Sequence, residues 1–186
     1  LAAVDVLKAA GAIVTAIEIP HLPEAKDANT IIMVTEAAAY HRSDLGSQFD
    51  TYGKFTSQVL ARGVLFSGAD YVQAQRFRSY FNKLISREME DIEVLIVPTS
   101  PTPAPKRADM SPEKQLAAPS FTGVWNLTGL PALALPTGMS STTLPLSMQI
   151  VGKPFAEEMV LRVGDAYQRL TAHHMNIPPI AAQVLV

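Results

Sequence analysis

Cysteine is absent from all 186 residues, which excludes a disulfide framework and any thiolate nucleophile or thiolate metal ligand. An excess of charge of one sign is also lacking, because 15 Lys and Arg stand against 17 Asp and Glu. Without a positive field to attract phosphate backbones, we expect no nucleic-acid partner. The uninterrupted apolar runs are short, Val94–Val97 among them, and a membrane helix needs about 20 apolar residues. We therefore expect no membrane partner and, without a basic and apolar leader, a cytoplasmic location.

The motifs of common catalytic and cofactor sites are missing as well. Neither G-x-x-x-x-G-K nor G-x-G-x-x-G occurs, so neither usual nucleotide loop is present. No G-x-S-x-G elbow holds a serine, and Gly138–Ser141 is better explained as a hairpin turn. The four histidines, at positions 21, 41, 173 and 174, lack the spacing of a helical zinc site. The residues alone therefore predict no metal, no cofactor and no catalytic set.

The composition is that of a globular chain long enough to bury one core, with 48% hydrophobic residues. Its first eleven residues, LAAVDVLKAAG, carry apolar residues at helical spacing and end on the helix stop Gly11. The apolar stretch Ala12–Ile19 then predicts a largely buried strand. A helix followed by a buried strand is the second half of a βαβ crossover, so we expect a chain cut from a longer protein. The alternative is a mature terminus that begins with a helix.

Four further helices are expected, over residues 31–42, 56–63, 67–91 and 156–173. The third has the strongest local signals, since Ser67 and Asp70 are spaced as in a capping box. The apolar stripe of this third helix is formed by Phe77, Tyr80, Phe81 and Leu84. The predicted buried face of the last helix is formed by Met159, Val163, Ala166 and Leu170. Residues 21–30 are predicted to form a loop, and residues 43–54 a polar excursion between helices.

Three strands and a stiff loop make up the remaining pattern. Val94–Val97 is typical of a central strand, and Pro98–Pro105 holds four prolines that keep the backbone extended. Ligands bind beyond the carboxyl ends of strands in open α/β sheets, so this loop is a candidate pocket wall. A rigid linker, or a ligand for a proline-binding module, is the alternative. Ala132–Leu135 and residues 146–151 are expected to pair as an antiparallel hairpin.

Four blocks of the sequence resemble the C-terminal part of the amidase signature family. They are TEAAAYHR, SGADYVQAQRFR, DIEVLIVPTSPTPAP, and FTGVWNLTGLPALALPTG with LPLSMQIVGKPFAEEMVLRVGDAYQ. Their order and spacing run nearly end to end. The resemblance implies an α/β fold, the C-terminal portion of one amidase domain over residues 1–186, with a mixed β-sheet flanked by helices.

The same resemblance implies hydrolysis of carbon–nitrogen amide bonds by a serine nucleophile, a second serine beside a cis peptide bond, and a lysine base. The Gly- and Ser-rich stretch that carries those serines in the family has no counterpart in this sequence. We therefore expect no catalytic residue here, no turnover by this chain alone, and the N-terminal portion of the same protein as its partner. The expected contribution is the substrate pocket wall, formed by Thr99, Ser100, Pro101, Thr102, Phe121, Thr122 and Trp125. Phe121 and Trp125 are equally compatible with an ordinary core.

The residue at one position limits the range of expected substrates. The A subunits of tRNA-dependent amidotransferases carry an Asp two residues before the Phe-Thr pair, where this sequence has Pro119. Proline cannot pair with a cation, so a stand-alone amidase acting on a small amide is favoured over a component of an amidotransferase. A non-catalytic scaffold is the alternative from another class. An isolated half-sheet exposes apolar surface, so a homo-oligomer is a further expectation.

Overall fold

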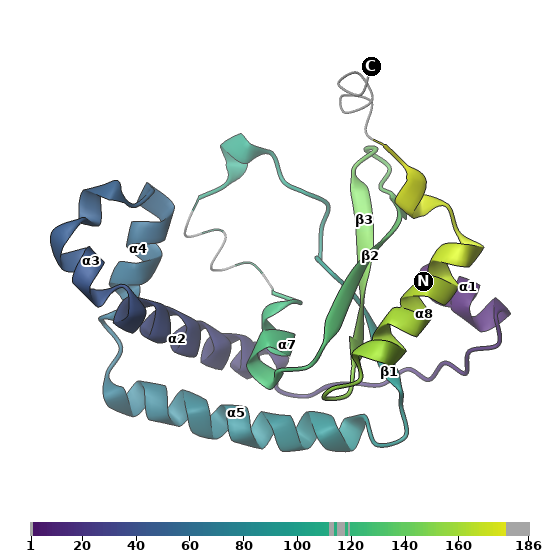
Figure 1. Cartoon of the computed structure of the whole chain (residues 1–186), viewed down its shortest axis with the longest axis horizontal. Helices are drawn as coiled ribbons and strands as arrows, with labels where there is room; N and C mark the ends of the chain where they lie inside the picture. Colours follow the sequence, from purple (N-terminus) through teal and green to yellow (C-terminus); the bar gives the residue numbers. More distant parts are fainter. Residues whose placement is uncertain (1, 112–113, 115–117, 119, 178–186) are drawn as a thin grey trace. The chain divides into compact units, whose positions relative to one another are not determined.

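The computed structural model describes residues 2–111, 114, 118 and 120–177. The chain is of the α/β class and divides into two compact units (Figure 1). The sheet unit comprises Leu1–Ile17, Ile92–Ala104 and Leu130–Val186, and the helical unit comprises Glu18–Asp91 and Pro105–Gly129. Each unit therefore draws on segments that are far apart in the sequence.

The sheet unit is built on three strands in the order β1-β3-β2, and both pairings are antiparallel. The strands are β1 (Val94–Pro98), β2 (Ala132–Met139) and β3 (Pro145–Gly152). The predicted hairpin of β2 and β3 is confirmed, and it closes where the Ser140 N–H donates to the Leu144 carbonyl at 2.8 Å. Strand β2 is longer than predicted and carries a bulge at Pro136–Gly138. Gly138 has a φ of 130° there, which a side chain would strain.

Helices α1 (Ala2–Ala9) and α8 (Glu157–Leu170) complete this unit, and the 3₁₀ turn η3 (His173–Met175) follows α8. Helix α8 contacts β2, β3 and α1. The core formed between them consists of Leu7, Leu135, Met148, Ile150, Val160 and Tyr167. The alternation of apolar residues along β3 thus delivers Met148 and Ile150 to the α8 side of the sheet.

The predicted buried face of α8 is wrong at two positions, because Ala166 and Leu170 are exposed. The buried residues are instead Val160, Gly164 and Tyr167. The glycine at position 164 explains why the buried face of α8 is rotated relative to the predicted one. A Cβ at Gly164 would lie 2.6 Å from Leu133 Cδ2 and 3.3 Å from Leu135 Cδ1, so the missing side chain lets strand β2 fill that part of the core.

The helical unit consists of α2 (Leu22–Tyr40), α3 (Arg42–Ser47), α4 (Lys54–Gly63), α5 (Gly68–Glu88) and α7 (Gly123–Thr128), with 3₁₀ turns η1 (Phe49–Thr51) and η2 (Arg107–Asp109). Helix α2 contacts α4, α5 and α7, and is thus the centre of the unit. Its apolar side chains include Ala25, Ala28, Ile32, Val34 and Ala38, all buried.

Helix α5 begins where its capping signal predicts. The Ser67 hydroxyl accepts from the Asp70 N–H at 3.1 Å, and the Asp70 carboxylate accepts from the Ser67 N–H at 2.8 Å. This reciprocal pair satisfies two backbone donors that the first turn leaves free. The predicted apolar stripe is confirmed at Phe81, which is fully buried, whereas Tyr80 is half exposed.

Two predictions near the N-terminal end are wrong. Ala12–Ile19 is not a strand, because these residues form no ladder with any residue that the structure describes, and Ile13 is 98% exposed. Residues 22–30, predicted as a loop, belong to α2. Pro23 lies in the first turn of that helix, where its missing N–H and fixed φ are tolerated.

A third correction concerns β1, which was predicted to be a central strand. It is an edge strand of the described sheet, whereas β3 is central.

Candidate functional site

The carboxyl end of β1 is held to β3 by two contacts beyond their regular pairing. The Thr99 N–H donates to the Ser147 carbonyl at 3.2 Å, which extends the ladder by one residue past the strand. The buried Gln149 side chain donates from Nε2 to the Pro98 carbonyl, also at 3.2 Å. These contacts fix the direction in which the proline-rich loop leaves the sheet.

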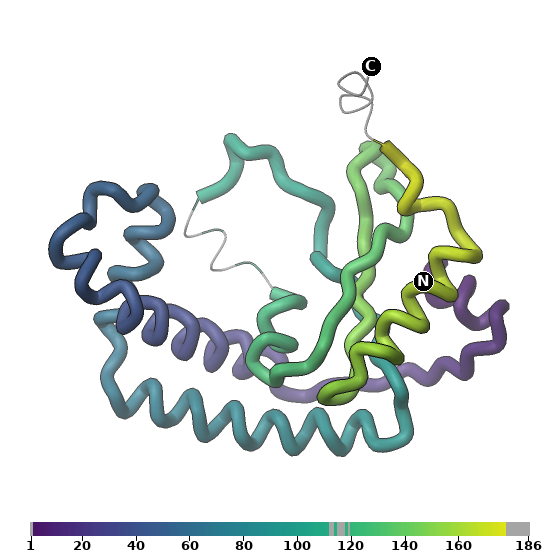
Figure 2. The backbone as a smooth tube through the Cα atoms, in the orientation of Figure 1, coloured from purple at the N-terminus to yellow at the C-terminus, as the bar shows by residue number. Residues whose placement is uncertain are grey.

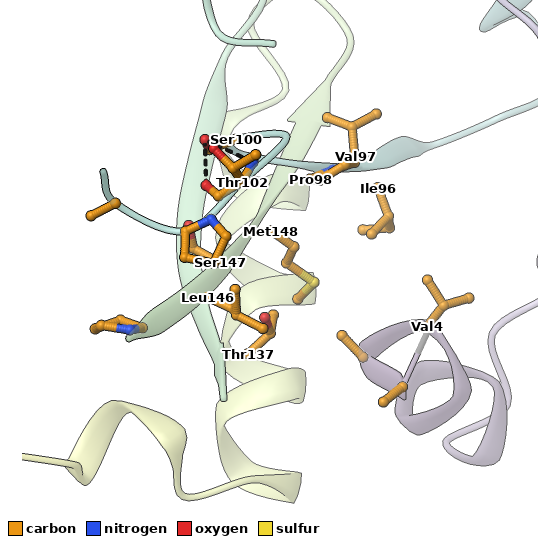
Figure 3. A pocket seen from close by; sticks show the side chains of 15 residues that line it. Val4, Ile96, Val97, Pro98, Ser100, Thr102, Thr137, Leu146, Ser147 and Met148 are labelled. Carbon is orange, nitrogen blue, oxygen red and sulfur yellow. Dashed lines mark hydrogen bonds between the residues drawn. The ribbon is translucent and has the colours of Figure 1, made fainter. Parts of the chain in front are cut away.

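The loop itself carries a local turn at Ser100. The Ser100 hydroxyl donates to the Thr102 carbonyl at 2.8 Å and lies 3.5 Å from the Thr102 nitrogen (Figure 3). Such a turn stabilises a backbone bend rather than activating a hydroxyl as a nucleophile. Ser100, Pro101 and Thr102 are exposed.

A pocket of about 760 Å³ opens beside this loop, within the sheet unit. Figure 3 shows Ile96, Met148 and the β2 residue Thr137 on its border, with Val4 of α1 opposite. Its lining is mainly apolar, with hydroxyls from the loop and from β2 and β3: Ala2, Ala3, Val4, Ile96, Val97, Pro98, Ser100, Thr102, Pro103, Ala104, Thr137, Pro145, Leu146, Ser147 and Met148. An apolar cavity with a few polar groups is the usual form of a small-molecule site.

Thr99 lies next to this lining and has a polar atom without a partner. Its Oγ1 is buried and makes no hydrogen bond with any residue that the structure describes. Burial of a hydroxyl without a partner costs about 1–3 kcal/mol. Thr99 therefore has an unused hydrogen-bonding group at the point where the loop begins.

The other three predicted wall residues lie in the helical unit, around the start of α7. Thr122 is exposed and makes no side-chain cap, and Phe121 is half-buried. Trp125 is 4% exposed, and its Nε1 has no partner among the described residues. The structure thus shows Trp125 to be buried in this chain, as the core interpretation predicts, while its indole donor stays unused.

Helix α7 was not predicted from the sequence, and several contacts hold it in place. Arg78 of α5 donates from Nε to the Leu127 carbonyl at 2.7 Å, across 49 residues of sequence. Gly129 ends the helix in the left-handed region with a φ of 73°, which suits a glycine at that position. A Cβ on Gly123 would lie 2.8 Å from Asn29 Nδ2, so α7 approaches α2 closely.

The structure brings Thr99, Ser100, Pro101 and Thr102 together in one loop of the sheet unit. It places Phe121, Thr122 and Trp125 together in the helical unit. Pro119 lies outside the described residues. Sequence reasoning missed Ile96, Thr137 and Ser147 as pocket residues. These residues could have been predicted from the alternation of side-chain directions along β1 and along the β2–β3 hairpin, considered together with the loop that follows β1.

Among the residues that the structure describes, no group of three His, Asp or Glu could hold a metal ion. Burial raises the pKa of the Tyr167 phenol, which keeps it neutral within the sheet unit's core. The ring of Tyr167 stacks on His173 with centroids 6.4 Å apart, which is a packing contact beside the η3 turn.

Comparison with known proteins decides the family. Residues 1–161 match the family model described as Amidase. The chain belongs to the amidase family. Among the described helices of this family member, none is long and apolar enough to span a membrane.

Relatives of known description agree with this assignment. The chain is 35% identical to an amidase of Pseudomonas putida over 187 residues, covering 96% of this chain and 40% of that protein. It is 31% identical to the A subunit of the glutamyl-tRNA(Gln) amidotransferase of Lysinibacillus sphaericus, covering 96% of this chain and 42% of that protein. Allophanate hydrolase of Kluyveromyces lactis has the same fold, with a TM-score of 0.78 and 26% identity over 89% of this chain and 28% of that one. The chain thus spans about two fifths of the length of the curated relatives.

Proposed function

We propose that this chain is the C-terminal portion of an amidase that hydrolyses the carbon–nitrogen bond of a small amide. The observation that carries the proposal is the 35% identity to the Pseudomonas putida amidase along nearly the whole chain. That match leaves the larger part of the relative uncovered, and the nucleophile is assigned to the corresponding part of the parent protein. The reaction is acyl transfer through a serine ester, with lysine as the base and N–H donors stabilising the oxyanion.

The contribution of this chain is the substrate pocket wall. The loop Thr99–Thr102 is rigid, lies at the carboxyl end of β1 and borders the 760 Å³ pocket through Ser100 and Thr102. Phe121, Thr122 and Trp125, around the start of α7 in the helical unit, are proposed as further substrate-binding residues. Each of these two groups of residues has a buried polar atom without a partner among the described residues, Thr99 Oγ1 in the first and Trp125 Nε1 in the second, and such an atom is available to an amide ligand.

The A subunit of a glutamine-dependent tRNA amidotransferase is the second candidate. Its support is the 31% identity to the Lysinibacillus sphaericus protein. We place it second because the identity is lower and because Pro119 stands at the position where such subunits carry an acid. A cytoplasmic location belongs to either proposal, and a sequence without cysteine is compatible with a reducing compartment.

The test uses the full-length parent protein and the 186-residue chain side by side. Ammonia release is measured with a panel of aliphatic and aromatic amides, and with glutamine in the presence of the other amidotransferase components. The expected result is turnover of a small amide by the parent and none by the chain alone. Turnover by the chain alone would refute the assignment of the nucleophile. Glutamine-dependent transfer would favour the second candidate, and no activity with any substrate would favour a scaffold.

A second experiment tests whether a predicted wall residue contributes to substrate binding. Thr122→Ala removes an exposed hydroxyl that makes no cap in the structure, and we expect kcat/KM of the parent to fall about 5- to 10-fold through the loss of one hydrogen bond. Ser141→Ala is the matched control, since Ser141 is equally exposed but lies in the hairpin turn between β2 and β3. If both variants have the same kcat/KM, Thr122 is not a residue of the pocket wall.

A further inference from the structure

Helix α7 is too short to hold its own position, so its place depends on contacts with its neighbours. It has six residues, Thr122 provides no side-chain cap, and an isolated helix of this length is unstable in water. Figure 2 traces this short coil beside α2 and α5, the two helices that it contacts within the helical unit. The contacts that these helices make with α7 therefore determine where its side chains lie, Trp125 among them.

The N-terminal end of α7 is held by close packing on α2. Gly123 is buried, and a Cβ there would lie 2.8 Å from Asn29 Nδ2, so the missing side chain allows the approach. The Gly123 N–H also donates to Ser120 Oγ at 3.2 Å. Apolar packing has no preferred direction, so the tilt of so short a helix requires a directional contact as well.

That directional contact is made by Arg78 at the C-terminal end of α7. Its Nε donates to the Leu127 carbonyl at 2.7 Å, and Leu127 is buried. The carbonyls of the last turn have no acceptor role inside the helix, so this one needs an outside donor. A charged guanidinium makes a shorter and stronger hydrogen bond than a neutral donor does. Arg78 forms no ion pair with any residue that the structure describes, so this carbonyl is the group that holds its guanidinium.

Arg78 belongs to a polar face of α5 whose other members hold α2. Tyr71, Gln75 and Arg78 follow one another at spacings of four and three residues, so they lie on one face of the helix. The Tyr71 hydroxyl donates to Glu36 Oε1 at 2.8 Å, and Gln75 Nε2 donates to the same oxygen at 3.4 Å. One face of α5 therefore carries the polar contacts to both neighbours, and Arg78 holds α7 against a helix that is itself bound to α2.

We propose that Arg78 is a positioning residue for the amidase reaction, which holds the C-terminal end of α7 so that Thr122 and Trp125 keep their place. Trp125 lies between the two ends that α2 and Arg78 hold, and its buried Nε1 has no partner among the described residues. The inference rests on the proposed function, because it requires that these two residues bind the substrate. Arg78 itself makes no contact with the reacting atoms. Its loss should therefore weaken binding of the ground state and the transition state alike and leave the chemical step unchanged.

Three variants of the full-length parent protein test this role. Arg78→Met keeps a long unbranched side chain but removes the donor and the charge, whereas Arg78→Lys keeps both. Arg76→Met is the matched control, since Arg76 is exposed on the same helix two residues away. Arg78→Met should raise KM for the amide about 10-fold with kcat within about 2-fold of wild type, and Arg78→Lys should restore most of the loss. Arg76→Met should leave both constants unchanged.

Other kinetic outcomes contradict the proposal. A lower unfolding midpoint of Arg78→Met in urea with an unchanged KM would mean that Arg78 only stabilises the fold. A fall in kcat at constant KM would mean that it acts on the chemical step. A KM that Arg78→Lys fails to restore at all would mean that the donor to the Leu127 carbonyl is not what matters.

The indole N–H signal of Trp125 gives a second measurement that requires no substrate. The parent is labelled with ¹⁵N-tryptophan, and the signal is assigned by its loss in Trp125→Phe. Arg78→Met should shift or broaden this signal, Arg76→Met should not, and Arg78→Lys should give an intermediate shift, which keeps the proposal testable if Arg78→Met does not fold. A signal identical to wild type in every Arg78 variant that folds would show that Arg78 does not position α7. A parent that hydrolyses no amide would instead contradict the proposed function, and the two failures are thus distinguishable.

Discussion

A single glycine determines how closely two helices of the helical unit approach. At Gly63, the last residue of α4, a Cβ would lie 2.0 Å from the Val34 carbonyl oxygen and 2.7 Å from Ala38 Cβ. Both obstacles belong to α2, and the nearer one is backbone that cannot rotate away. The missing side chain of Gly63 therefore allows the short distance between α2 and α4. A glycine is required at this position for packing and not for its backbone conformation.

We expect Gly63→Ala to lower the free energy of unfolding by about 1–3 kcal/mol through overpacking. The matched control is Gly46→Ala in α3, where a Cβ meets nothing within 4 Å. That substitution should be neutral or stabilise by up to about 1 kcal/mol, since alanine is the better helix former. Urea titration of both variants gives the comparison. A Gly63→Ala variant as stable as wild type would mean that α2 and α4 are not in contact at this point.

At the residue scale, local chemistry was predictable and long-range burial was not. The Ser67–Asp70 capping box depends on two residues three apart, so the sequence is sufficient to predict it. The buried face of α8 depends on which helix surface meets Leu133 and Leu135 of a distant strand. Gly164 has no apolar side chain, and periodicity of apolar residues cannot identify it as part of the buried face.

The start of α5 is the place where one substitution isolates the contribution of a helix cap. Ser67→Ala removes the hydroxyl that accepts from the Asp70 N–H, and about 1 kcal/mol of stability should be lost at neutral pH. Two hydrogen bonds from Ser67 hold the pKa of the Asp70 carboxyl below its ordinary value of 3.8. A lowered pKa in the folded state stabilises the fold above the unfolded-state pKa. That contribution is lost as pH falls through the folded-state pKa.

Asp70→Asn should therefore be less stable than wild type near pH 7, and the difference should shrink as the pH falls below 3.8. Thermal unfolding of both proteins between pH 7 and pH 3 measures this. A difference that stays constant over the range would show that the carboxylate charge plays no part in the cap. Glu88→Gln, at the exposed last residue of the same helix, is the control for a change of charge alone.

At the scale of elements, the sequence was reliable where an element carries its own signals. Helices α4, α5 and α8 and the β2–β3 hairpin are confirmed, because caps, apolar spacing and turn residues lie within each segment. Helix α7 has six residues and no side-chain cap, so it depends on contacts with α2 and α5 that no local pattern encodes. Ala12–Ile19 has strand-like composition, but a strand also needs a neighbour, and the described residues provide none.

At the scale of the whole molecule, family and fold class followed from the sequence, whereas the wall of the site stays a prediction. The resemblance rested on blocks distributed along the chain, and the family match over residues 1–161 confirms it. The wall residues fall into two units, Thr99–Thr102 in one and Phe121, Thr122 and Trp125 in the other. A site shared between distant segments depends on tertiary arrangement, which spacing along the sequence does not specify.

The exposed segment after α1 gives the last prediction, which concerns association. Ile13 is 98% exposed and lies in an extended stretch beside Val14, which is 42% exposed. Extended apolar segments with unpaired backbone promote pairing between chains, so the isolated chain should self-associate with rising concentration. Ile13→Thr keeps the branched shape but removes apolar surface, and should weaken association while changing the free energy of unfolding by less than about 0.5 kcal/mol.

Sedimentation velocity over a range of concentrations measures this association, with Val72→Thr as the control. Val72 is 56% exposed but lies on the helix α5, whose backbone donors and acceptors are already paired. If exposed apolar area alone drove association, the two substitutions would weaken it to a similar degree. If the unpaired extended backbone is required, only Ile13→Thr should do so. A wild-type chain that stays monomeric at every concentration would show that the segment after α1 is no interaction surface in the isolated chain.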